Sequence, residues 1–91
     1  MYFLAINKIK QEEVAVNFTA IIKNHIEWTK KEIENGNILQ AGKWGKSGGM
    51  SIIKALSIDE AERVLRNDPL IQAGLVNYEI DEFYPDKKIN F

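Results

Sequence analysis

The segment ILQAGKWGKSGGMSIIKAL, residues 38–56, stands at the middle of the chain and decides its fold. Residues 38–44 and 50–56 have the short apolar runs of two strands. Between them lies Gly45-Lys46-Ser47-Gly48, whose glycines permit a tight reversal. The segment is therefore predicted to form a β-hairpin.

A helical pattern stands on each side of the hairpin. Before it, apolar residues recur with a helical period over residues 14–35, and Gly36 supplies the usual C-terminal stop. After it, Ser57 and Glu60 have the spacing of a capping box, which predicts a second helix over residues 58–67. The apolar arc of the first helix holds Phe18, Ile21, Ile22, Ile26 and Ile33, with Trp28 at its edge.

Two further strands are predicted, one before the first helix and one after the second helix. Residues 2–8 are apolar on both alternating faces, as in a central strand that is covered on both sides. Polar and apolar residues alternate over residues 75–83. Before that last strand, Asp68-Pro69 starts a short helical turn that ends at Gly74. Ile89 and Phe91, in a tail without periodicity, could dock on a partner.

The order of these elements predicts the fold class. Strand, helix, strand, strand, helix, strand is the ferredoxin-like βαββαβ arrangement of α+β proteins, an antiparallel four-stranded sheet with two helices on one face. We expect residues 1–91 to form a single domain. The other face of the first strand would be bare in one subunit, which predicts a homodimer that packs sheet on sheet.

Composition excludes several classes of function. The 12 Lys and Arg residues against 13 Asp and Glu residues leave a net charge of −1, so neither nucleic acid nor an anionic membrane surface is an expected partner. The absence of cysteine excludes disulfides and thiolate chemistry. The apolar start has no basic lead-in and ends at Asn7, well short of a membrane span, so a cytoplasmic protein is expected.

The chain resembles the YCII-related family, relatives of muconolactone isomerase within the dimeric α+β barrel group. The resemblance rests on the order and spacing of five pieces. They are His25, Gly36-Asn37-Ile38-Leu39-Gln40-Ala41-Gly42, Gly48-Gly49, Ser57-Ile58-Asp59-Glu60-Ala61 and, most specific, Asp68-Pro69-Leu70-Ile71-Gln72-Ala73-Gly74-Leu75. The chain departs from the family at Lys43, where proline is common, and in its shortened hairpin loop beside Trp44.

The resemblance implies a catalytic pair, His25 and Asp68, in a cleft between helices and sheet. It also implies a homodimer, able to assemble further, that acts on small organic molecules without a cofactor. The expected chemistry is isomerisation, elimination or hydrolysis of a small organic or aromatic-derived acid or lactone. Trp28, Gly42, Trp44 and Gly49 are the candidate substrate-binding residues, and no metal site is expected.

Each candidate also has a structural interpretation. His25 can be a buried structural histidine, and Asp68 suits the N-cap before Pro69. The glycines suit turns and close packing better than a phosphate cradle, and the tryptophans suit packing. A non-enzymatic metabolite-binding module is the main alternative. Haem-degrading or monooxygenase chemistry on Asn24, His25 and Trp28 is a weaker one, based on fold analogy.

Overall fold

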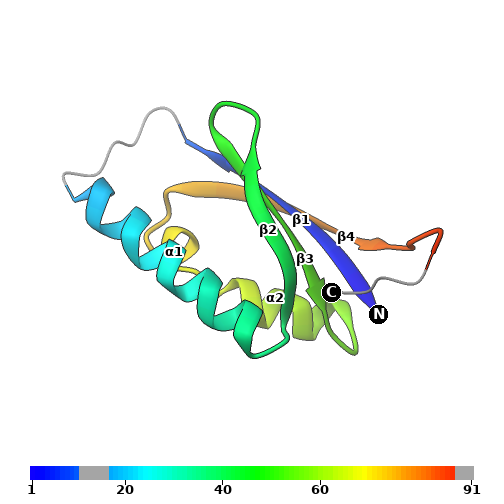
Figure 1. The fold of residues 1–91 in the computed structure, drawn as a ribbon. Coiled ribbons are helices and arrows are strands. Elements are labelled where there is room, and N and C mark those ends of the chain that lie inside the picture. Colours follow the sequence, from blue (N-terminus) through cyan, green and yellow to red (C-terminus); the bar gives the residue numbers. More distant parts are fainter. Residues whose placement is uncertain (11–16, 88–91) are drawn as a thin grey trace.

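Four strands form one antiparallel sheet in the computed structural model, which describes residues 1–10 and 17–87. The strand order is β2-β3-β1-β4, so the first strand is central and pairs with β3 and β4 (Figure 1). The strands are β1 (Tyr2–Ile9), β2 (Ile38–Trp44), β3 (Gly48–Lys54) and β4 (Val76–Phe83). The predicted hairpin and the central position of the first strand are both confirmed.

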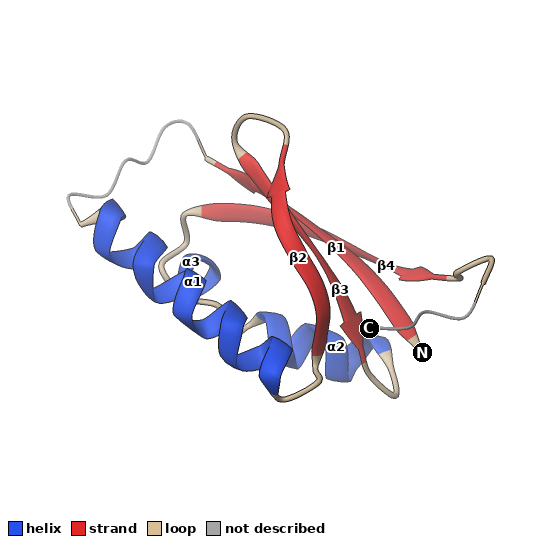
Figure 2. Ribbon diagram, viewed as in Figure 1, coloured by secondary structure: helices blue, strands red, loops and turns tan. Residues whose placement is uncertain are grey.

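The helices lie together on one face of this sheet, and no described helix covers the other face (Figure 2). They are α1 (Phe18–Glu34), α2 (Ile58–Leu65) and the short α3 (Pro69–Gln72). The order β-α-β-β-α-β with this strand order is the predicted ferredoxin-like α+β fold. Among the helices of the described segments, none combines the length and apolar character that crossing a membrane requires.

The helix ends follow the local signals in the sequence. Gly36 has a φ of +83°, and its N–H donates to the Ile33 carbonyl at 3.1 Å. The Asn37 N–H donates to the Glu32 carbonyl at 3.0 Å, which completes a Schellman motif at the end of α1. The predicted start of this helix at residue 14 lies outside the described residues, as do Ile89 and Phe91 of the tail.

The bounds of the third strand and of the second helix differ from the predicted ones. The third strand begins at Gly48 and ends at Lys54, rather than spanning residues 50–56. Leu56 is 83% exposed, and its N–H donates to the Glu60 carboxylate at 3.4 Å, so it belongs to the capping loop of α2. The Glu60 N–H in turn donates to Ser57 Oγ at 3.2 Å, as the capping box predicts. α2 ends at Leu65, two residues before the predicted end.

On the side of the sheet that faces the helices, large side chains fill one end and small side chains leave space at the other end. Phe3, Ile38 and Ile53 lie side by side across three strands and are fully buried. In the next row, Ala5, Ser51 and Ala41 pair across the same strands and leave far more room. β2 contributes Ile38 to the first row and Ala41 to the second. A register shift between Ile38 and Gln40 lets both of these residues face the helices.

Helix α1 covers the open end without filling it. None of its side chains is fully buried, and Ile26 and Ile33 on its apolar arc are 47% and 40% exposed. Ile22, Ile26 and Ile33 of this arc form one wall of a hollow between the helix and the sheet. Phe18 and Ile21 instead pack against the buried cluster of Leu70, Leu75 and Val76.

Candidate functional site

Asp68 occupies the turn where α2 gives way to α3. Its backbone is extended, its side chain accepts a hydrogen bond from the Leu70 N–H at 2.9 Å, and Pro69 takes the first helical position. The predicted N-cap is therefore confirmed. Asp68 is only 1% exposed and is the one charged side chain that is buried within the described parts of the chain.

The same carboxylate contacts His25 on the facing helix. His25 Nδ1 lies 2.7 Å from Asp68 Oδ1, although the two residues are 43 positions apart. The contact expected between these side chains is present. Both hydrogen bonds of the Asp68 side chain, from Leu70 and from His25, fall on Oδ1. The N-cap and the histidine contact therefore coexist on a single oxygen.

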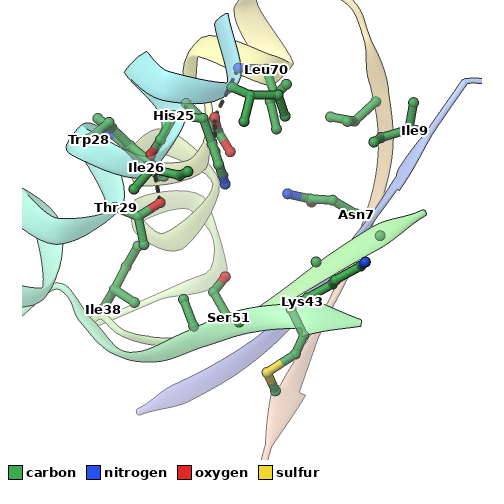
Figure 3. Close-up of a pocket in the computed structure, with 18 of the residues that line it drawn as sticks. Asn7, Ile9, His25, Ile26, Trp28, Thr29, Ile38, Lys43, Ser51 and Leu70 are labelled. Atoms are coloured by element: carbon green, nitrogen blue, oxygen red, sulfur yellow. Dashed lines mark hydrogen bonds and ion pairs between the residues drawn. The ribbon is translucent and has the colours of Figure 1, made fainter. Parts of the chain in front are cut away.

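This geometry sets which nitrogen of His25 is free. A carboxylate accepts hydrogen bonds, so in the neutral ring Nδ1 donates its hydrogen and Nε2 carries the lone pair. The His25 side chain is 26% exposed, and its ring projects from α1 into the space in front of the sheet (Figure 3). The Thr29 hydroxyl donates to the His25 carbonyl at 2.8 Å, one turn along the same helix.

His25 and Asp68 line a cavity of about 600 Å³ between the helices and the sheet. A cavity of this volume is large enough for a small organic molecule. Its walls are mostly apolar and include Ile22, Ile26 and Ile33 of α1, Leu65 of α2 and Leu70 of α3. The small residues Ala41 and Ser51 and the glycines Gly42 and Gly49 form its floor on β2 and β3.

The four candidate substrate-binding residues divide into two groups. Trp28, Gly42 and Gly49 line the cavity, and the Trp28 ring lies 6.3 Å from the His25 ring at an angle of 31°. Trp44 does not line it and is 51% exposed. Neighbouring residues of a strand point to opposite faces, so Lys43 faces the cavity and Trp44 points away. The described chain gives no support to Trp44 as a ligand contact.

Several cavity residues escaped the sequence analysis. Asn7 lines the cavity from β1, and its Oδ1 atom is buried without a hydrogen-bond partner among the described residues. The signal was present, since Asn7 is a polar residue on the same strand face as Phe3 and Ala5. Lys30, Lys43 and Lys46 also line the cavity.

The weaker alternative, haem-degrading or monooxygenase chemistry, is not supported by the positions of its residues. Asn24 is exposed on α1 and does not line the cavity with His25 and Trp28. Within residues 1–10 and 17–87, no three acidic or histidine side chains come together as a metal site would require.

A comparison with family models decides the relationship. The model of the YCII-related domain matches residues 1–84. The chain belongs to this family. A search of curated proteins found no match. As a YCII-related domain, the chain carries His25, Asp68 and the cavity floor within the matched segment.

Two solved structures share the fold of this YCII-related chain. One is muconolactone isomerase, with 16% identity, a TM-score of 0.76, and coverage of 100% of this chain and 98% of that chain. The other is 5-chloro-2-hydroxyhydroquinone dehydrochlorinase from Burkholderia phenoliruptrix AC1100, in complex with 2,5-dihydroxybenzoquinone. It has 22% identity and a TM-score of 0.69, with coverage of 92% of this chain and 94% of that chain.

Proposed function

We propose that the chain is a small enzyme that uses His25 and Asp68 for acid/base chemistry on a small organic or aromatic-derived acid or lactone. One observation carries the proposal, namely the 2.7 Å contact between His25 Nδ1 and Asp68 Oδ1 at the wall of a cavity of about 600 Å³. An imidazole that is held by a carboxylate and exposed to a ligand-sized space is a common general base.

The chemistry follows from the assignment of the two nitrogens. Nε2 of His25 takes a proton from the ligand, and Asp68 holds the ring in place and stabilises the imidazolium that forms. Return of this proton to another atom of the same ligand is an isomerisation. Departure of a leaving group after proton removal is an elimination, and a proton taken from water starts a hydrolysis. No cofactor takes part in these proton transfers.

The similar solved structures favour this class of reaction. By their names, one is an isomerase and the other removes hydrogen chloride from a ring compound. Both names refer to small ring compounds, and removal of hydrogen chloride includes the loss of a proton. In this chain, Trp28, Gly42 and Gly49 are the proposed substrate-binding walls, and Trp28 would lie against the face or edge of a ring.

A turnover screen tests the proposal. Purified chain is incubated with muconolactone, chlorinated hydroxyhydroquinones and related ring lactones, and products are followed by NMR. For an accepted substrate, His25→Ala should lower kcat on the order of 10²- to 10⁴-fold. The control is Asn24→Ala, which changes the neighbouring exposed residue of α1 and should leave kcat unchanged.

Thermal unfolding of the same variants separates a catalytic histidine from a structural one. A packed, hydrogen-bonded imidazole contributes about 1–3 kcal/mol to the free energy of unfolding. A loss of that size in His25→Ala, with turnover unchanged, would show that the histidine is structural.

A non-enzymatic binding module is the second candidate, favoured by the size and apolar character of the cavity. It predicts that compounds of the screen bind to wild-type chain and are recovered unchanged. Binding without turnover, across compounds that carry removable protons, would replace the enzyme by the binding module.

A further inference from the structure

The charged side chains around the cavity are unbalanced in sign. Three lysines line it, Lys30 on α1, Lys43 on β2 and Lys46 in the β2–β3 turn, against the single carboxylate of Asp68. The Oδ1 atom of Asp68 already accepts two hydrogen bonds. The whole chain has a net charge of −1, so this positive lining is a local feature. An apolar cavity with cationic side chains at its rim attracts small anions.

One of these lysines, Lys43, belongs to a row of residues that crosses the sheet along the cavity floor. Lys43 pairs with Gly49, and Gly49 pairs with Asn7 on the next strand. Residues paired across strands share a face, so the three residues form one line along the cavity floor. Neighbouring strands are about 4.8 Å apart, which places the backbones of Lys43 and Asn7 about 10 Å apart. Gly49 between them has no side chain, and the floor there is open.

The far end of this row carries a hydrogen-bonding group. The amide of Asn7 points into the cavity, and its nitrogen end is directed toward the side of His25 (Figure 3). Its Oδ1 atom is buried without a partner among the described residues, and as an acceptor it cannot bond to a carboxylate, so a ligand carboxylate can be bound only by the Nδ2 end. An amide NH2 group that faces a cavity is suited to donate a hydrogen bond to a ligand oxygen.

We propose that the cavity binds ring-shaped monocarboxylates, with the carboxylate over Gly49 between the Lys43 ammonium and the Asn7 amide. The ring then lies in the apolar part of the cavity, where His25 Nε2 reaches it. This inference rests on the proposed function and adds the charge and the orientation of its substrate.

Binding of a matched pair of probes tests the orientation without any turnover. Benzoate and benzamide have nearly the same shape and differ in charge, and both are titrated into ¹⁵N-labelled chain. We expect benzoate to bind roughly 3- to 10-fold more tightly, a range set by one partly exposed lysine and a salt-dependent attraction. The amide signal of Gly49 should shift most.

Variants test whether the preference for benzoate depends on Lys43 and Asn7. Lys43→Met keeps the length of the side chain and removes its charge, and should abolish the preference for benzoate. Lys23→Met, an exposed lysine of α1 that does not line the cavity, should retain it. Asn7→Leu should weaken the binding of benzoate, and His25→Ala should retain the preference because the imidazole does not hold the carboxylate.

The outcomes distinguish this inference from the proposed function. A preference that survives in Lys43→Met, no preference in wild type, or no binding of either probe to the folded chain would overturn the inference. Loss of the preference in Lys43→Met, with no turnover of any compound, would support the inference while removing the enzyme.

Discussion

At the scale of single residues, Asp68 has two functions that mutation can separate. Its carboxylate caps α3 through the Leu70 N–H and holds the His25 ring, and both contacts use Oδ1. Asparagine is as good an N-cap as aspartate, because its side-chain oxygen accepts the same backbone hydrogen bond. It has no negative charge with which to stabilise an imidazolium.

Asp68→Asn should therefore fold with nearly the stability of wild type, and Asp68→Ala should lose about 1–2 kcal/mol of unfolding free energy with the cap. If the charge of Asp68 is used in catalysis, Asp68→Asn should still lower kcat on the order of 10²-fold. Urea unfolding and the turnover assay measure the two effects. Equal kcat in Asp68→Asn and wild type would leave Asp68 with its structural function alone.

At the scale of elements, the β2–β3 hairpin depends on a close approach at Gly48. A Cβ atom at this position would lie 2.5 Å from the Asn7 carbonyl oxygen and 2.9 Å from the Trp44 carbonyl oxygen. Both are backbone atoms, which cannot move without shifting β1 or β2. Gly42, on the neighbouring strand, has no atom within 4 Å of the same point and serves as a control.

Gly48→Ala should lower the free energy of unfolding by about 1–3 kcal/mol, because the strands must separate to admit the methyl group. Gly42→Ala should change it by less than about 0.5 kcal/mol. Because Asn7 belongs to the cavity floor, Gly48→Ala should also shift the NMR signals of cavity residues. Equal stability of the two variants would show that the hairpin tolerates the added methyl group.

These elements also show what could be predicted from the sequence. The stop at Gly36 and the caps at Ser57 and Asp68 were predictable because each depends on residues within one helical turn. The ends of β3 were not, since the partner strand and the cap of α2 decide which residues pair. Asn7 stood out as a polar residue on the strand face of Phe3 and Ala5, but its place on the cavity floor depends on pairing with Gly49, a contact between distant parts of the chain.

At the scale of the whole molecule, the sheet has one face toward the cavity and one that no described helix covers (Figure 2). On the second face, Leu4 pairs with Ile52 and Ile6 pairs with Met50, which makes a continuous apolar surface at the centre of the sheet. Surfaces of this kind are usually covered in soluble proteins. Pairing of two chains through these faces remains our proposal, and each subunit would keep its own cavity on the opposite side.

Light scattering over a dilution series should give about twice the chain mass of 10.4 kDa at micromolar concentration. Ile52→Glu places a charge at the centre of the apolar face and should give the mass of one chain. Thr19→Glu, on an exposed position of α1, should remain a dimer.

Because Ile52 does not line the cavity, the monomeric variant should still bind benzoate if each subunit has a complete site. A wild-type chain that is folded and monomeric at micromolar concentration would contradict the dimer, and loss of binding in monomeric Ile52→Glu would show that the site needs the partner.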